Sequence, residues 1–331
     1  MKQFICFIFI LSITINFTLL EDSLPYRNVL YYADWSIYTG QRNFYPSKID
    51  ANLISHLIFS DLDMDSNGDL VLQDEFADFQ IITLPEFEDE IKFGEPFGGV
   101  IGAIAILKVK HPHLKIGISV GGITSYEIFS EVAKDKVKRH NFANSIVKFI
   151  NHLGYDFVDV GYPKTIKEED SDYAENFILL LQEIRSELNA FEKNGIRYEL
   201  SVTMPISPIL KDKIQFDKVL EIVSFVNMKT YDLNGNWNSY TGHHTPLYTN
   251  EEYNLETMSE AKFSVDGVIK HLENTYGNTI DMTKIIIGVA PYTRGWEGVK
   301  NDGLNTDNPG LYATANSSSV KSADGTFSGI Y

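Results

Sequence analysis

Aromatic, carboxylate and amide side chains recur where short β-branched runs of this sequence end. Five strand ends stand out, in chain order: Tyr31-Tyr32 with Trp35, Ser119-Val120-Gly121-Gly122, Met204-Pro205, Tyr231-Asp232, and Arg294-Gly295-Trp296. Sugar rings offer flat C–H faces and many hydroxyls, so a sugar site needs indole and phenol platforms beside hydrogen-bonding Asp, Asn and Arg side chains. Core packing explains any one of these aromatics equally well. The ordered set predicts a carbohydrate-binding cleft.

The runs themselves predict parallel strands. Seven of them alternate with helical stretches: 29–35, 56–61, 115–120, 156–160, 199–204, 223–230 and 285–289. Residues 142–150 and 177–184 place apolar side chains three and four apart, which is typical of amphipathic crossover helices. No Gly-x-Gly-x-x-Gly follows the first run, so a (β/α)8 TIM barrel is favoured over a dinucleotide-binding sheet. An eighth strand is not visible, and 62–98 is interpreted as a long βα excursion.

Charge and the first residues limit the classes of partner. The 331 residues include 45 acidic and 28 basic side chains, a net charge of −17 that argues against nucleic acid and membrane surfaces as partners. Lys2 and the apolar run at 4–20 predict a secretory signal at 1–20 and an extracellular protein, with a membrane anchor as the alternative. Cys6, the only cysteine, lies in this run. Residues 21–331 are therefore predicted to form one barrel domain without disulfides.

Taken in order, the motifs resemble those of glycoside hydrolase family 18, the chitinases. The resemblance covers about residues 28–331 and rests on the strand ends above, on Asp156-x-x-Asp159 with Tyr162-Pro163, and on Thr241-Gly242-His243 with Pro246-Leu247-Tyr248. It implies a barrel that binds chitin or N-acetylglucosamine oligomers. In the family's substrate-assisted mechanism, the substrate's acetamido oxygen attacks the anomeric carbon while one glutamic acid protonates the leaving oxygen. The chain ends in what resembles the start of the insertion before the last strand, so we expect the barrel to lack strand eight.

The resemblance fails at the family's acidic motif, Asp-x-x-Asp-x-Asp-x-Glu. Here Gly161 and Pro163 stand where the third Asp and the Glu belong, and a two-residue gap that aligns Tyr162-Pro163 with the family's Tyr-Pro supplies no acid either. Asp156, Asp159 and Tyr231 are what remains of the catalytic set. Further departures are Asp61, Ile123 and Lys229, the last of which is a candidate partner for Asp61 or Asp159. A relocated acid at Glu168 or Glu169 is the alternative.

The resemblance also assigns a set of substrate-binding residues: Tyr31, Trp35, Gly121, Gly122, Met204, Tyr231, Asp232, Arg294 and Trp296. No His or Cys group has metal-ligand spacing, so we predict neither a metal nor another cofactor, and His243-His244 are interpreted as structural or solvent-facing. Three hypotheses follow: a silent chitin-binding protein, a chitinase with a relocated acid, or a decayed or incomplete gene product. The sequence does not predict an oligomeric state.

Overall fold

The structure is a computed structural model. It describes residues 26–39, 42–81, 84, 98–121, 126–162, 172–192, 197–235, 237–249, 263–296, 298–300, 302 and 308–315. The predicted signal at 1–20 lies outside these ranges, as do Gly122, Ile123, Pro163, Glu168 and Glu169. None of the described helices combines the length and the apolar character that a membrane crossing requires.

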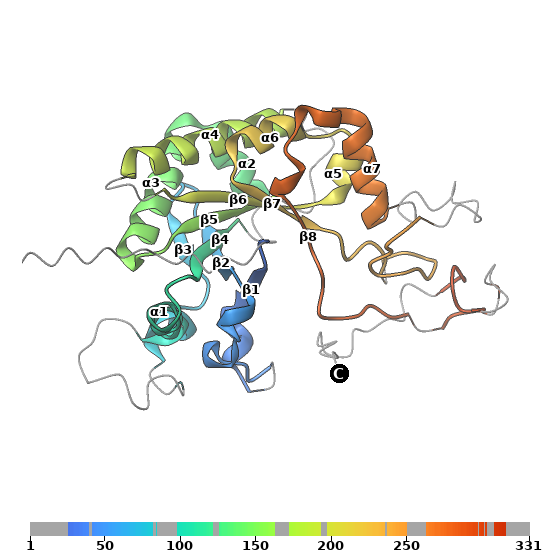
Figure 1. Cartoon of the computed structure of the whole chain (residues 1–331), viewed down its shortest axis with the longest axis horizontal. Helices are drawn as coiled ribbons and strands as arrows, with labels where there is room; N and C mark the ends of the chain where they lie inside the picture. The colour runs from blue at the N-terminus through green and yellow to red at the C-terminus, as the bar shows by residue number, and fades with distance from the viewer. Residues whose placement is uncertain are drawn as a thin grey trace, which may run out of the picture.

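A single curled sheet organises the chain (Figure 1). Its strands are β1 (Val29–Ala33), β2 (His56–Met64), β3 (Leu70–Leu72), β4 (Lys115–Val120), β5 (Phe157–Gly161), β6 (Glu199–Pro205), β7 (Phe225–Lys229) and β8 (Ile285–Ile287). The spatial order is β1-β2-β4-β5-β6-β7-β8 with parallel pairing throughout, while β3 pairs antiparallel with β2. Each of the seven predicted runs forms a strand, and the predicted parallel TIM-barrel-like fold is confirmed.

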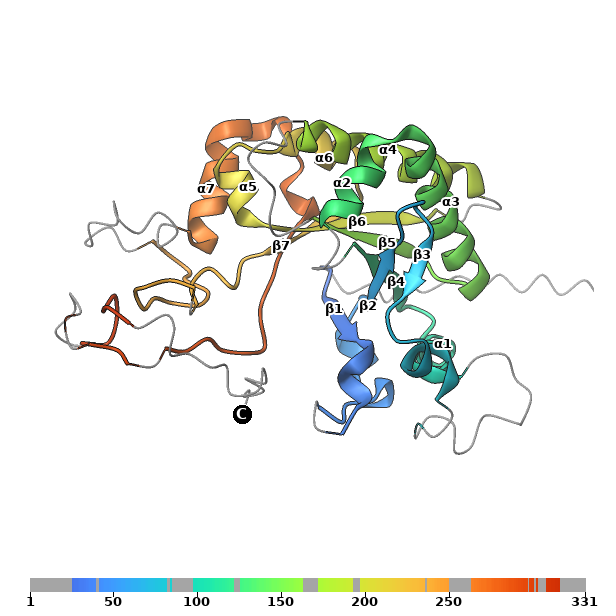
Figure 2. The same ribbon diagram turned by 180° about the vertical axis from the view of Figure 1, so that it is seen from behind.

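Helices follow the strands and cover the outer side of the sheet (Figure 2). The α-helices are α1 (Gly99–Lys110), α2 (Tyr126–Lys134), α3 (Lys136–Leu153), α4 (Tyr173–Phe191), α5 (Ile206–Leu210), α6 (Phe216–Ile222) and α7 (Val265–Tyr276). Short 3-10 turns are η1 (Asp34–Ile37), η2 (Pro46–Lys48), η3 (Ala51–Leu53), η7 (Gly277–Thr279) and η8 (Met282–Lys284), and η4 (Phe76–Gln80) is a π-helical turn. The main core lies between these helices and the sheet.

Local sequence explains why α3 starts and stops where it does. The Asp135 carboxylate caps the helix by accepting hydrogen bonds from the backbone N–H groups of Val137 and Lys138 at 2.8 and 3.0 Å. The helix ends at Gly154, whose φ of 67° is the left-handed conformation that glycine adopts without a steric cost. The apolar stripe predicted from 142–150 faces the core: Phe142, Ala143, Ile146, Val147 and Ile150 are all buried.

The excursion at 62–98 contains more structure than its sequence predicts. The second strand continues three residues past Asp61 and turns back as a hairpin, so that β3 covers its end. The turn at Asp65 docks on α3, since a Cβ added at Gly68 would lie 2.4 Å from the Lys138 carbonyl oxygen. This turn is held by Asp65, whose carboxylate accepts hydrogen bonds from the backbone of Asn67 and Asp69. The weak hydrophobic periodicity of this segment therefore did not indicate the hairpin that it forms.

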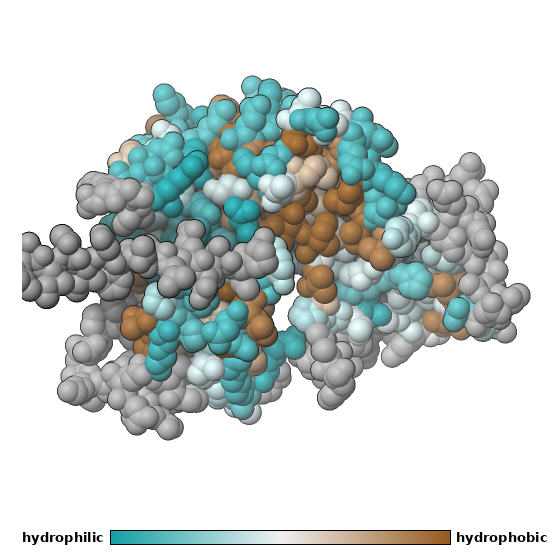
Figure 3. All heavy atoms as spheres, viewed as in Figure 1, coloured by the Kyte–Doolittle hydropathy of each residue, from teal (hydrophilic) through white to brown (hydrophobic). Residues whose placement is uncertain are grey.

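The curled sheet is open on one side in the part of the chain that the structure describes. There, β1 pairs only with β2, and β8 pairs only with β7. Figure 3 shows hydrophobic side chains gathered in the middle of this face, and Ile287 and Val289 at the β8 edge are 39% and 82% exposed. The concave side of the sheet, whose strand ends carry the predicted site residues, borders this opening.

Candidate functional site

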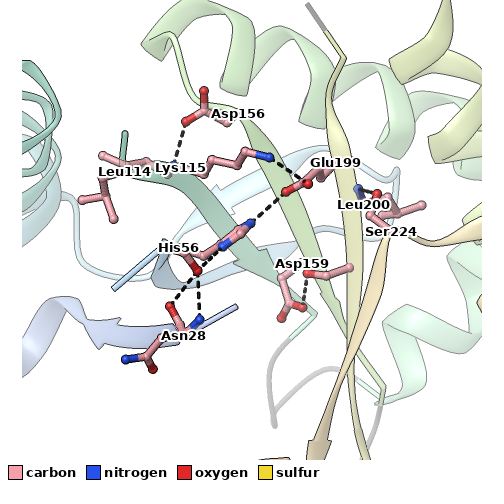
Figure 4. Close-up of polar contacts among 12 residues, drawn as sticks. Asn28, His56, Leu114, Lys115, Asp156, Asp159, Glu199, Leu200 and Ser224 are labelled. Atoms are coloured by element: carbon pink, nitrogen blue, oxygen red, sulfur yellow. Dashed lines mark hydrogen bonds and ion pairs between the residues drawn. The ribbon is translucent and has the colours of Figure 1, made fainter. Parts of the chain in front are cut away.

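The concave side of the sheet is built in layers, and its amino-terminal layer is charged. Figure 4 shows His56 of β2 and Lys115 of β4 directed at Glu199 of β6, with His56 Nε2 and Lys115 Nζ each 2.9 Å from a carboxylate oxygen. Burial alone would raise the pKa of Glu199, but the hydrogen bonds from His56 and Lys115 outweigh it and lower the pKa to about 2. The His56 ring also packs edge-on against Phe157 and Phe225, the start of an apolar layer.

Asp159 forms the centre of the layer above. It has no exposed surface, and five side chains donate hydrogen bonds to its two carboxylate oxygens: Ser201 Oγ at 2.6 Å, Thr203 Oγ1 at 2.7 Å, Tyr31 OH at 3.0 Å, Ser119 Oγ at 3.2 Å and Asn227 Nδ2 at 3.3 Å. The donors come from four other strands, so one carboxylate ties β1, β4, β6 and β7 to β5. Asp159 therefore orients the Tyr31 phenol, which lines the cavity above.

Asp156 belongs to the same motif but lies at the other end of β5. It precedes the strand, pairs with Lys108, and accepts a hydrogen bond from the backbone of Ile116 at 2.7 Å. Its side chain is one-third exposed. Of the two remaining motif aspartates, only Asp159 is therefore near the carboxyl ends of the strands, where barrel proteins carry their ligand sites.

A cavity of about 860 Å³ lies at these carboxyl ends. The predicted residues that line it are Tyr31, Trp35, Gly121, Tyr231 and Asp232. Trp35 and Trp237 are 47% and 43% exposed, so each presents part of its indole to solvent. Burial, followed by the charges of Asp232 and Asp159, raises the pKa of Tyr231 to about 12, which keeps its phenol a hydrogen-bond donor.

Three other predicted substrate-binding residues are not among the described residues that line the cavity. Met204 is fully buried, because the alternation of β6 turns Thr203 and Pro205 toward the cavity and Met204 toward the helices. Trp296 does not line the cavity, and its indole Nε1 is buried with no hydrogen-bond partner among the described residues. Gly122 lies outside the described residues.

Gly161 occupies the wall of the cavity where the resemblance predicts an acidic side chain. A Cβ added there would lie 2.8 Å from the carbonyl oxygen of Gly121, closer than real Cβ atoms approach backbone. Gly121 has a φ of 83° and is packed in turn against the Phe129 ring, 2.7 Å from its own would-be Cβ. The ends of β4 and β5 thus approach each other in a way that only glycine permits.

Two charged side chains that the resemblance marks as departures from the family pattern lie on the cavity wall. Asp61 and Lys229 both line it. Burial raises the pKa of Asp61, and the charge of Asp63 adds to this, while the positive charge of Lys229 acts in the opposite direction. The electrostatic influence of Lys229 on Asp61 agrees with one of its two predicted pairings. Asp159 instead satisfies both of its oxygens with uncharged donors.

Asp232 anchors the part of the cavity wall that follows β7. Its φ of 57° is unusual for a residue other than glycine, and its carboxylate accepts hydrogen bonds from Arg294 Nε at 2.7 Å and Tyr292 OH at 2.7 Å, with His244 Nε2 at 2.9 Å. Burial would raise the pKa of Asp232, but these bonds, led by that from Arg294, lower it. The Arg294 guanidinium lies 5.4 Å from the centre of the Trp237 ring, so the same cluster positions the exposed indole.

The sequence indicates only part of this wall. Tyr292 and His244 were not predicted as site residues, and no spacing in the sequence marks them, because they reach Asp232 from loops 60 and 12 residues away. The expectation that His244 is structural agrees with its contact to Asp232. Two conformational features also belong to tertiary structure alone: the left-handed backbone at Asp232 and the cis peptide between Ser60 and Asp61.

A curled parallel βα sheet with an aromatic-lined cavity at its carboxyl ends defines a TIM-barrel-type protein. The sequence profile of glycosyl hydrolases family 18 matches residues 27–328. The chain therefore belongs to this family.

Known relatives agree with the assignment. The chain is 27% identical over 283 residues to Chitinase 1 of Aphanocladium album, covering 84% of this chain and 63% of that protein. It is 28% identical over 322 residues to Chitinase A1 of Niallia circulans, covering 86% of this chain and 44% of that protein. The structure of chitinase ChiA74 from Bacillus thuringiensis superimposes with a TM-score of 0.74 at 27% identity, covering 87% of this chain and 51% of that one. The chain thus spans less than two thirds of the length of these relatives.

Proposed function

We propose that this chain is a secreted family 18 protein that binds chitin or N-acetylglucosamine oligomers in the cavity and has lost the ability to hydrolyse them. The replaced acidic motif carries the loss of hydrolysis. Pro163 stands where the family's motif has its glutamic acid, and at Gly161, where the motif has its third aspartate, the Gly121 carbonyl leaves no room for a side chain. Removing an acid catalyst lowers the rate by roughly 10²- to 10⁴-fold, and losing the aspartate beside it deepens the loss. Secretion rests on the apolar run at 4–20 that follows Lys2.

The retained cavity supports binding. Its 860 Å³ falls within the range of small-molecule sites, and Trp35 and Trp237 offer indole faces to the C–H faces of a sugar. The clusters around Asp159 and Asp232 hold Tyr31 and Trp237 in place without a ligand, so little ordering accompanies binding. A preorganised aromatic surface with hydrogen-bonding neighbours suits a neutral polysaccharide.

The test is to incubate the purified full chain with insoluble chitin and to measure both the fraction pulled down and the reducing ends released over a day at several pH values. We expect binding without release. Release that disappears in Glu168→Gln or Glu169→Gln would instead establish an active chitinase with a relocated acid. If the protein shows no binding and no release, the hypothesis of a decayed or incomplete product is favoured. Cooperative thermal unfolding would then identify a folded protein of another function.

A variant at the cavity makes the binding test specific. Trp237→Ala removes an exposed indole, and the loss of one aromatic stacking partner, worth about 1 kcal/mol, should weaken binding roughly fivefold to tenfold. The control is Tyr26→Ala, which removes a 68% exposed aromatic side chain that does not line the cavity. Equal binding by the two variants would contradict the proposed ligand site, whatever the chain's hydrolytic activity.

A further inference from the structure

A second group of chemically active side chains lies away from the cavity, on the outer helices. His140 projects from α3, and Glu183 and Glu187 project from α4, which packs beside it (Figure 1). The Nδ1 atom of His140 lies 3.0 Å from Glu183 Oε1 and 3.4 Å from Glu187 Oε1. One atom from each side chain lies within 4.8 Å of the others. None of the three lines the cavity.

The helices bring these groups together by ordinary geometry. Glu183 and Glu187 are four residues apart, so they lie one above the other on the same face of α4. The buried stripes of α3 and α4 fix the two helices against each other, which places His140 opposite both carboxylates. The ligands come from positions 43 and 47 residues apart in the chain, and for that reason no spacing in the sequence indicates a site.

Two carboxylates compete for one imidazole nitrogen in this cluster. The Nδ1 atom carries at most one hydrogen, yet two carboxylates approach it. In the part of the chain that the structure describes, neither Glu183 nor Glu187 forms an ion pair with a lysine or arginine. The group therefore places two carboxylates around a nitrogen that has only one hydrogen to share between them. A cation placed among the three atoms would satisfy all of them.

The two histidine–carboxylate separations are compatible with a metal centre. Zinc binds His nitrogen at about 2.0–2.1 Å and carboxylate oxygen at about 2.0–2.2 Å, so two ligands on a tetrahedral ion lie roughly 3.4 Å apart. The two histidine–carboxylate separations, 3.0 and 3.4 Å, are close to this ligand–ligand distance. One imidazole with two carboxylates suits Zn²⁺ better than Mg²⁺ or Ca²⁺, which prefer all-oxygen sites.

We propose that His140, Glu183 and Glu187 bind a divalent transition-metal ion, zinc by preference, which cross-links α3 to α4 with water completing the coordination. Side-chain exposures of 54%, 27% and 22% leave the site open to solvent ions. Since the ion would bind the folded protein and not the unfolded chain, it stabilises the fold in proportion to the logarithm of the free metal concentration. The site is structural and independent of sugar binding.

The experiment uses the full chain without a histidine tag, stripped with EDTA, and titrated with ZnCl2 by calorimetry. We expect one zinc ion per chain and a thermal midpoint that rises with free zinc and returns on adding EDTA. His140→Ala and Glu187→Gln should each weaken binding by more than about 100-fold, because losing even an outer-shell partner commonly costs 10- to 100-fold. Co²⁺ in place of zinc should give a visible absorption band that His140→Ala abolishes.

The matched control is His271→Ala, which removes another histidine–carboxylate pair, with His271 Nε2 3.2 Å from Asp212 Oδ1 and, among the described residues, no second carboxylate paired with it. This variant should bind zinc like the parent. The proposal is overturned if the parent shows neither zinc heat nor a thermal shift, if His140→Ala and Glu187→Gln bind as tightly as the parent, or if His271→Ala loses binding equally. Chitin pull-down by the zinc-free protein should be unchanged, so failure here leaves the sugar site testable.

Discussion

Asp159 and Asp156 stand three residues apart in one motif, and replacing each by asparagine isolates what burial does to a carboxylate. The amide introduced by Asp159→Asn would keep one oxygen, which can still accept from two neighbours, but its NH2 group would face the remaining donors of the cluster. Hydroxyl donors can rotate to accept, which recovers part of the loss. One or two charged hydrogen bonds are thus lost, each worth about 1.5–3 kcal/mol.

We therefore expect Asp159→Asn to lower the free energy of unfolding by about 2–4 kcal/mol. Asp156→Asn removes only a partly exposed ion pair with Lys108, for which about 1 kcal/mol or less is typical. Urea denaturation followed by tryptophan fluorescence measures both values with equal slopes if unfolding is two-state. An Asp159→Asn cost below about 1 kcal/mol, or equal costs for the two variants, would refute the claim that the five donors hold a carboxylate.

Two other predictions concern stability near the cavity. Burial raises the pKa of Asp34 to about 6, with the charges of Asp61 and Asp74 adding to it. Burial likewise raises the pKa of Asp78 to about 8, with the charges of Asp34 and Asp74 adding to it. The folded state therefore retains protons that the unfolded chain, with carboxyl pKa values near 4, releases, and this contribution to stability is lost as pH rises from about 4 to about 8. Urea denaturation should show that Asp78→Asn raises the free energy of unfolding by at least about 2 kcal/mol relative to the parent at pH ~8 and by little at pH ~4. A difference that does not change with pH would contradict this prediction. Gly161→Asp should lower the free energy of unfolding by about 1–3 kcal/mol and restore no hydrolysis. The control is Gly295→Asp, which should be nearly neutral because an added Cβ there meets nothing within 4 Å. A stable and active Gly161→Asp variant would contradict the close approach to Gly121.

Strand-forming runs and helix stripes were sufficient to predict the parallel sheet, the two long helices and the end of the strands where the cavity lies. These features depend on residue composition and hydrophobic period, which can be determined from short stretches of the sequence. The strand ends and the family resemblance together predicted Tyr31, Trp35, Gly121, Tyr231 and Asp232 as site residues, and all five line the cavity because strand ends converge on one side of any parallel sheet.

Tertiary structure alone decided which side chains of each strand face inward. Both faces of these strands are buried, so burial did not distinguish Met204 from Thr203 in the sequence, and only the pairing of neighbouring strands did. The contacts of Asp232 with Tyr292 and His244, the approach of Gly161 to Gly121, and the meeting of His140 with Glu183 and Glu187 likewise join segments distant in the chain. Their chemistry comes from distances between atoms, and a sequence specifies those distances only once the chain has folded.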